Sequence, residues 1–261
     1  MISHYYKNMK IGEAAAEKLD VVIKKAFGLI FNNLGKISEY DIAQFILAEF
    51  KQRGLEVDKK IPWPIVAAGR NTQFVHYHPQ KKSALIKKGD LIMLDIWARP
   101  VRNKISNGVK DKSSGHFADI TWMGFAGEKA PEQYNKIFNR VISARDEAVK
   151  FIRRQLRIKK IPSGAAVDKI TRDYFKKYKL EKYFLHGLGH SLGRSSCHGH
   201  DFRLAPSDQS QIKINVPFTI EPGLYFKNKF GMRSEIDCYI DKNYRFVITT
   251  KIQKKLFFSK N

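Results

Sequence analysis

Apolar residues recur at helical spacing near the start of the chain and form shorter, strand-like runs further along it. The spacing over residues 10–29 predicts an amphipathic helix. A second helix is predicted from Ser38 to near Gly54, because Ser38 and Asp41 have the spacing of a capping box. The strand-like runs that follow have the sequences IVAAG, TQFVHYH, ALI, DLIMLDIWA and FADITWMGF.

The same order of elements begins again after Gly127. Two helices are predicted over about 131–157 and 163–178, and further strand-like runs continue to the end of the chain. When the two halves are aligned, a few residues match. Any two amphipathic helices give some such matches, so this is only weak evidence for an internal repeat. Two successive helix-helix-strand units nevertheless predict an α+β fold, with helices covering one face of a mostly antiparallel sheet and a functional site on the other face.

No segment rich in proline, glycine and serine divides the chain. We therefore expect a single domain over residues 1–261, with pseudo-repeats at about 10–127 and 130–255 and no separate N-terminal domain. No signal-peptide pattern or long uncharged apolar run occurs, so the expectation is a soluble, cytoplasmic protein without membrane contact. The two cysteines, Cys197 and Cys238, lack the spacing of a disulfide framework or a structural zinc site.

The chain is strongly basic, with 48 Lys and Arg against 25 Asp and Glu and a formal net charge of +23. Such a charge allows contact with RNA, ribosomes or another anionic surface. The basic residues are scattered in pairs, however, and no nucleic-acid-binding motif occurs. A lysine-rich solvated surface is the favoured interpretation, and nucleic-acid or ribosome contact remains the alternative.

Ionisable residues interrupt apolar runs in both halves of the chain. Each of them alone has an ordinary explanation, but buried like charges that converge need cations. Oxygen ligands with a single nitrogen suit Mn, Fe(II), Co or Zn, and four carboxylates favour two ions over one. Two such ions can activate a shared water and polarise a carbonyl, which predicts amide or ester hydrolysis. The residues are Asp95 in LIMLDIW, Asp119 in FADITW, His190 in HGLGHSLG, Glu221 in FTIEPG and Glu235 in MRSEIDC.

These five motifs, in this order, resemble the pita-bread metallopeptidases, which include methionine aminopeptidases, Xaa-Pro aminopeptidases and prolidases. The resemblance extends over nearly the whole chain and implies a pita-bread fold with a curved sheet. It further implies that Asp95 binds one metal ion and that His190 and Glu221 bind the other. Asp119 and Glu235 would bridge the two ions, and Glu221 would also transfer protons.

Further histidines match the resemblance less completely. The run AAGRNTQFVHY resembles a family segment and implies that His76 lines the substrate pocket, with His78 as the competing choice. The family also has a histidine seven residues after the metal-binding one, where this chain has Cys197. A one-residue bulge would bring His198 to that place. His200 is the competing choice, and the remaining alternative is an ordinary loop histidine without a functional role.

Two residues indicate the branch of the family. His186 in HGLGH and Arg233 in MRSEID resemble substrate-site residues of the Xaa-Pro enzymes, although the chain is closer in size to a small methionine aminopeptidase. A salt bridge from Arg233 to Asp237 or to another acid is the structural alternative. The polar run VRNKISNGVKDKSSG lengthens the connection between the two aspartates, and it either shapes access to the cleft or has no role.

The leading hypothesis is a dinuclear metal-dependent exopeptidase that hydrolyses short Xaa-Pro peptides by attack of a metal-bridging hydroxide. Methionine aminopeptidase is the alternative within the family, and a non-peptide C–N substrate stays open. A non-catalytic module that binds RNA or ribosomes is the alternative from another class. The peptide substrate is the expected partner, and a homodimer is compatible with the sequence.

Overall fold

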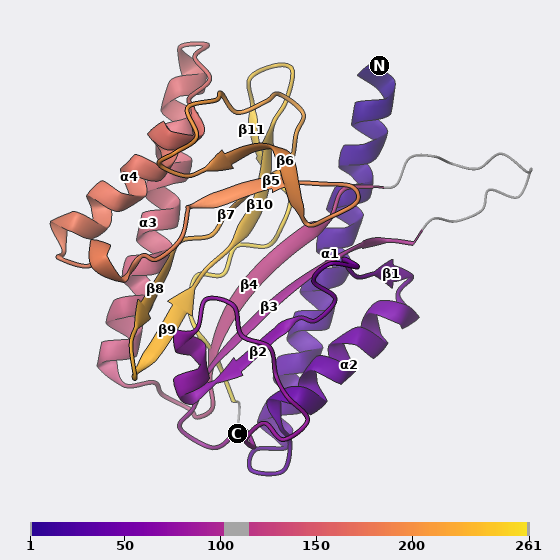
Figure 1. Ribbon diagram of the computed structural model, residues 1–261, viewed down its shortest axis with the longest axis vertical. Helices are drawn as coiled ribbons and strands as arrows, with labels where there is room; N and C mark the ends of the chain where they lie inside the picture. The colour runs from indigo at the N-terminus through magenta and orange to yellow at the C-terminus, as the bar shows by residue number, and fades with distance from the viewer. Residues whose placement is uncertain (1, 102–114, 260–261) are drawn as a thin grey trace, which may run out of the picture.

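The computed structural model describes residues 2–101 and 115–259, and Figure 1 shows the arrangement of their elements. None of the helices in this part of the chain is both long and apolar enough to cross a membrane. The helices are α1 (Ile2–Asn32), α2 (Glu39–Gln52), α3 (Glu132–Arg157) and α4 (Gly164–Lys177), with short 3₁₀ turns at Gly69–Gln73 and Glu181–Tyr183.

The strands form two five-stranded sheets and a two-stranded hairpin, all within the described residues. The first sheet pairs β1 (Leu55–Glu56), β2 (Ile65–Ala68), β3 (Leu91–Pro100), β4 (Ala118–Phe125) and β12 (Phe257–Phe258). The second sheet has the order β11 (Phe246–Ile248), β10 (Ile236–Ile240), β7 (Phe218–Ile220), β5 (Gly189–Leu192) and β6 (His198–Leu204). The hairpin joins β8 (Gly223–Phe226) to β9 (Phe230–Arg233). Only the β4–β12 pair is parallel among these, so the predicted antiparallel character is confirmed.

The predicted helices are all present, and their N-terminal caps explain where two of them begin. The Ser38 hydroxyl accepts a hydrogen bond from Asp41 N at 3.2 Å, and the Asp41 carboxylate accepts from Ser38 N at 2.9 Å. This reciprocal arrangement is the capping box expected for α2. The Ser163 hydroxyl caps α4 by accepting from Ala166 N at 3.3 Å.

The predicted strand TQFVHYH is wrong, because residues 69–73 form a 3₁₀ turn and no strand follows before β3. Gly69 begins the turn at φ +54°, a conformation that glycine adopts without strain. The buried Glu39 then accepts hydrogen bonds from the side chains of Asn71 and Tyr77 at 2.6–3.0 Å. Side-chain bonds thus hold this segment where a strand ladder was expected. The run ALI likewise makes only an isolated bridge, between Leu85 and Ser38.

The two helix pairs lie against different sheets (Figure 1). Helices α1 and α2 pack on one face of β3 and β4, where Ile92, Leu94 and Ile96 join their apolar core. Successive strand residues point to opposite faces, so Asp95 faces the other way, together with Met93 and Trp97. Helices α3 and α4 contribute to the second core with the strands of the other half.

The two large sheets meet at the strands that carry the acidic motifs. The backbone N–H of Glu235 donates to the carbonyl of Thr121 on β4 at 3.4 Å. The backbone N–H of Asp119 donates to the Asp237 carboxylate on β10 at 2.9 Å. The junction therefore brings residues from distant parts of the chain together. The polar run between the two aspartates lies mostly outside the described residues, which resume at 115.

Candidate metal centre

Three carboxylates converge at the junction of the two sheets. Asp95 and Asp119 lie on one face of the β3–β4 pair, where Asp95 is paired with Thr121 and Asp119 with Trp97. Glu235 reaches the same place from the turn between β9 and β10. One oxygen of each carboxylate lies within 4.8 Å of the others, and the three residues are 7%, 6% and 1% exposed. This clustering agrees with the sequence expectation for these three residues.

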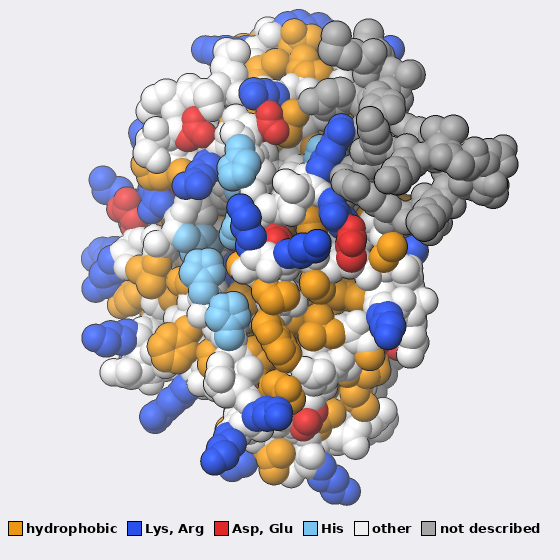
Figure 2. Space-filling view, turned by 45° about the vertical axis from the view of Figure 1, so that its right-hand side comes forward, with side chains coloured by type: hydrophobic (Ala, Val, Ile, Leu, Met, Phe, Trp, Pro, Cys, Tyr) orange, Lys and Arg blue, Asp and Glu red, His pale blue; other side chains and the backbone are white. Residues whose placement is uncertain are grey.

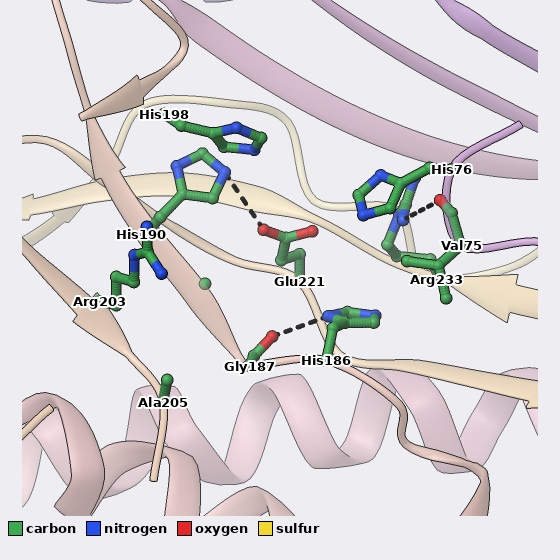
Figure 3. Close-up of a pocket in the computed structure, with 11 residues that line it drawn as sticks. Val75, His76, His186, Gly187, His190, His198, Arg203, Ala205, Glu221 and Arg233 are labelled. Atoms are coloured by element: carbon green, nitrogen blue, oxygen red, sulfur yellow. Dashed lines mark hydrogen bonds and ion pairs between the residues drawn. The ribbon is translucent and has the colours of Figure 1, made fainter. Parts of the chain in front are cut away.

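His190 on β5 and Glu221, which directly follows β7, join the cluster from the second sheet (Figure 3). The Thr219 hydroxyl links them, because it accepts from His190 N and donates to Glu221 Oε1, both at 3.1 Å. His190 Nε2 then lies 3.4 Å from Glu221 Oε1 and 3.9 Å from Asp119 Oδ2. The five predicted metal-ligand residues are therefore assembled in one place.

The donor atoms at this place fit divalent cations. Asp119 Oδ1 and Glu235 Oε1 are buried and have no hydrogen-bond partner within the described residues. His190 Nδ1 lies 3.1 Å from the Ser191 carbonyl, which can only accept, so this nitrogen carries the proton. Nε2 is therefore unprotonated, and its lone pair faces the carboxylates. Metal-binding histidines adopt this arrangement. Oxygen donors with one neutral imidazole suit the divalent ions expected from the sequence.

The electrostatics of the cluster favour proton uptake when no cation is bound. Burial, followed by the neighbouring carboxylates, raises the pKa of Asp119 and of Glu235 well above the ordinary values. Burial also raises the pKa of Glu221 to about 7, against the opposing effect of Arg233. Burial, aided by His198, lowers the pKa of His190 to about 3, so this imidazole is neutral at physiological pH.

The raised carboxyl pKa values predict that the acids of the metal-free cluster stabilise the protein less as the pH rises. A carboxyl group whose pKa is raised on folding binds more protons in the folded state, so its contribution is present below the unfolded value of about 4 and is lost as the pH rises through the folded value. For Glu221 this window ends near pH 7. The lowered pKa of His190 has the opposite effect below about pH 6.5, so the carboxyl contribution is isolated by comparison with Glu235→Gln. In urea unfolding with a chelator, we expect the free energy of unfolding of the parent minus that of Glu235→Gln to be lower at pH 7.5 than at pH 5.5. An unchanged or higher difference at pH 7.5 would contradict the prediction.

Arg233 supplies a positive charge to the cluster. Its guanidinium forms a buried ion pair with Asp95 and donates to the Thr121 hydroxyl at 3.0 Å and to the Tyr225 hydroxyl at 3.1 Å. Thr121 in turn donates to Glu235 Oε2 at 2.8 Å. The salt-bridge alternative for Arg233 is therefore realised with Asp95 as the acid.

Two cavities that share lining residues border the cluster. The inner cavity, of about 200 Å³, is lined by the five ligand candidates together with an apolar wall of Ile61, Ile65 and Trp97. The outer cavity, of about 300 Å³, shares His190 and Glu221 with it, and Figure 3 shows the side chains that line it. Figure 2 shows histidine side chains gathered near the middle of one face, while Lys and Arg side chains are scattered around it. The residues lining the outer cavity include His76, His186, His198, Arg203, Ala205 and Arg233.

The predicted pocket histidines occupy these cavities to different extents. His76 and His198 line both cavities, whereas His78 lines only the inner one, and His200 is absent from the described linings. The ring of His198 lies 4.3 Å from that of His190, centroid to centroid. His186 lines the outer cavity, where its Nε2 is 3.1 Å from the Tyr225 hydroxyl. The functional roles of these histidines stay predictions.

The strand pairing around His198 is more irregular than a one-residue bulge. His190 is opposite Arg203, so regular antiparallel pairing would put Asp201 opposite Leu192, yet Leu192 is opposite His198. The register therefore shifts by three residues. Asp58 supports the irregular segment, since its buried carboxylate accepts from the Ser196 hydroxyl at 2.6 Å and from Cys197 N at 2.7 Å.

Two further residues, which the sequence patterns did not mark as site residues, contact the cluster. Cys197 Sγ lies 3.0 Å from Asp119 Oδ2, so the position where the family has a histidine places a thiol beside a ligand carboxylate. Asp237 holds the backbone of Asp119, as described above. Its position two residues after Glu235 was a signal, because residues two apart on a strand share a face. No pattern pointed to the contact of Cys197.

Comparison with known proteins places the chain in a family. The sequence profile of metallopeptidase family M24 matches residues 7–242. An uncharacterised peptidase of Methanocaldococcus jannaschii is 30% identical over 252 residues, which are 95% of this chain and 63% of the relative. A Xaa-Pro dipeptidase of Pyrococcus furiosus is 27% identical, over 91% of this chain and 60% of its own length. The chain thus spans less than two thirds of the length of these relatives.

Solved structures agree with this assignment. A dipeptidase from Pyrococcus horikoshii OT3 superposes with a TM-score of 0.78 and 27% identity, covering 97% of this chain and 62% of that chain. A prolidase from Thermococcus sibiricus gives a TM-score of 0.75 and 25% identity, covering 97% of this chain and 61% of that one. The expected pita-bread fold is confirmed by this likeness. Because the profile matches most of the sequence, this chain belongs to metallopeptidase family M24.

Proposed function

We propose that this chain carries the catalytic centre of an exopeptidase that uses two divalent metal ions to hydrolyse short peptides with proline as the second residue. The observation that carries the proposal is the buried cluster of three carboxylates beside His190 and Glu221, in which two carboxylate oxygens have no hydrogen-bond partner among the described residues. Buried acids in such a cluster need cations to remain ionised. The proline preference is supported by the Xaa-Pro dipeptidase among the relatives and by the placement of His186.

Each residue of the centre has a proposed part in the reaction. The two ions would be held by five residues: Asp95, Asp119, His190, Glu221 and Glu235. When bound, a pair of divalent ions supplies a water of lowered pKa and a polarised substrate carbonyl. The Glu221 carboxylate lies 3.4 Å from His190 Nε2 at the centre, where it can take up a proton and return it during one turnover.

The surrounding residues position the substrate. His76 and His198 line the inner cavity, where an imidazole N–H can donate to the oxygen of the scissile carbonyl as negative charge develops on it. His186, fixed by its contact with the Tyr225 hydroxyl, faces the outer cavity and contacts the substrate there. Arg233 acts on the substrate site mainly through Asp95, because its own donors are already used inside the protein.

The proposal predicts metal uptake and hydrolysis together. After dialysis against Mn and removal of free ions, we expect about two ions per chain, as a two-metal site requires. The loaded protein should hydrolyse Ala-Pro and Leu-Pro, and a chelator should abolish turnover. Hydrolysis confined to Met-Ala peptides would replace the proposal by methionine aminopeptidase activity. Salt-dependent RNA binding without metal uptake would replace it by a binding module.

A further inference from the structure

The thiol of Cys197 contacts a proposed metal ligand from outside the two cavities. Its Sγ lies 3.0 Å from Asp119 Oδ2, and an ionised carboxylate can only accept, so the thiol is the donor when Asp119 is ionised. Cys197 is 1% exposed and is absent from the described linings of both cavities. Among the described residues, its Sγ also lies outside the group of carboxylate oxygens within 4.8 Å of one another. The thiol is therefore placed to support Asp119 and not to bind the ions.

The two carboxylate oxygens of Asp119 have different surroundings. Oδ2 is the oxygen that contacts the thiol, whereas Oδ1 is buried without a hydrogen-bond partner in the described part of the chain. The backbone N–H of the same residue donates to the Asp237 carboxylate at 2.9 Å. Each carboxylate oxygen has more than one lone pair, so Oδ2 can accept from the thiol and still bind an ion. Asp119 is thus held at its backbone and at one oxygen, and its other oxygen is available to a cation.

The loop that carries Cys197 is fixed by its backbone. The N–H of Gly193 donates to the carbonyl of Cys197 at 3.2 Å, and the N–H of Phe117 donates to the carbonyl of Gly193 at 3.0 Å. Phe117 directly precedes β4, the strand that carries Asp119. A Cβ at Gly193 would lie 2.4 Å from a backbone carbonyl oxygen of the loop, so this close approach requires glycine. Asp58 holds the other end by accepting from Cys197 N at 2.7 Å.

We propose that Cys197 is a positioning residue that orients Asp119 for metal binding through its hydrogen bond to Oδ2. This inference rests on the proposed metal centre and adds to it a residue that touches neither the ions nor the substrate. Hydrogen bonds from surrounding residues fix the orientation of metal-ligating side chains, and their loss weakens metal binding. A neutral thiol supplies such a bond without adding charge to a cluster that already contains several carboxylates.

The test measures the affinity for Mn by calorimetric titration of the metal-free protein. Cys197→Ala should lower this affinity about 10- to 100-fold, the usual effect of removing a residue that orients a metal ligand. Cys197→Ser should recover most of the loss, because serine and alanine both lack the volume of the sulfur and only serine keeps a donor. Cys238→Ala is the matched control and should bind Mn like the parent, since this second buried thiol lies 3.4 Å from the backbone carbonyl of Phe218.

Two outcomes would overturn the positioning role directly. An equal loss of affinity in Cys197→Ala and Cys197→Ser would mean that the sulfur acts by filling space. Cobalt tests the other possibility, because a thiolate bound to Co(II) gives a sulfur-to-cobalt charge-transfer band in the near ultraviolet. The Co-loaded parent should lack this band. A band that is present in the parent and missing in Cys197→Ser would make Cys197 a metal ligand.

Metal binding is measured without turnover, so this inference and the proposed peptidase activity can fail separately. If Cys197→Ala binds Mn more weakly than Cys197→Ser and the parent while no peptide is hydrolysed, the role of Cys197 stands and the proposed activity fails. Equal affinities in the parent and in Cys197→Ala refute the role of Cys197 even in an active enzyme. A parent that takes up no Mn refutes both.

Discussion

Replacement of Glu221 with glutamine is expected to lower kcat for Ala-Pro by about 10²- to 10⁴-fold, the usual contribution of a positioned proton-transfer group. The amide keeps the shape of the side chain but cannot accept and return a proton. The contact of Glu221 with the Thr219 hydroxyl at 3.1 Å and with His190 at 3.4 Å fixes the side chain, so the substitution should disturb the fold little. Steady-state kinetics of the Mn-loaded protein measure the effect.

Metal content must be measured beside the rate, because Glu221 is both a proposed ligand and the proposed proton carrier. A lower rate with both ions retained would show that Glu221 acts in proton transfer. A lower rate together with the loss of one ion would show that Glu221 is needed for metal binding. Glu128→Gln, at an exposed position after β4, is the matched control and should change neither quantity. An undiminished rate in Glu221→Gln would remove both roles assigned to this residue.

The helices and their ends were predictable because the signals that define them are local. Ser38 and Asp41 bond to each other's backbone, and the pattern that reveals them needs only four consecutive residues. The face of β3 to which each side chain points was equally predictable. Side chains alternate between the two faces of a strand, so Asp95 points away from the helices. In both cases the sequence neighbours of a residue decide its environment.

The elements that were predicted incorrectly depend on distant partners. The run TQFVHYH, residues 72–78, has the composition of a strand. Glu39 on α2 instead accepts hydrogen bonds from Asn71 and Tyr77, and residues 69–73 form a 3₁₀ turn. The register shift in β6 similarly depends on Asp58, which lies far from it along the chain. No local pattern records these long-range contacts, so periodicity alone assigns the wrong element or the wrong register.

The candidate centre was more predictable than its surroundings for a chemical reason. A carboxylate inside an apolar run is conspicuous in a sequence, and each of the four acids stands in such a run. The residues that surround these acids do not stand out in the sequence in this way. Cys197 and Arg203 occupy ordinary places in their segments, and only the fold brings the first to Asp119 and the second to the cavity.

Arg233→Met is expected to lower the free energy of unfolding of the metal-free protein by about 3–5 kcal/mol, the usual cost of removing one partner from a buried ion pair. Arg233 is 2% exposed, and its loss leaves the buried Asp95 without its cation and Thr121 without a donor. Urea unfolding in the presence of a chelator measures this change. Lys169→Met, which removes the exposed pair with Asp173, is the control and should cost less than about 1 kcal/mol.

The same substitution should be less damaging when metal is bound. A divalent ion at the cluster replaces part of the positive charge that Arg233 provides, so Asp95 is no longer an unpaired buried charge. The difference in unfolding free energy between Arg233→Met and the parent should therefore shrink at saturating Mn, while the small effect of Lys169→Met stays constant. A cost that is independent of Mn would mean that Arg233 stabilises the protein by packing alone and that Asp95 does not share its charge between the arginine and a metal ion.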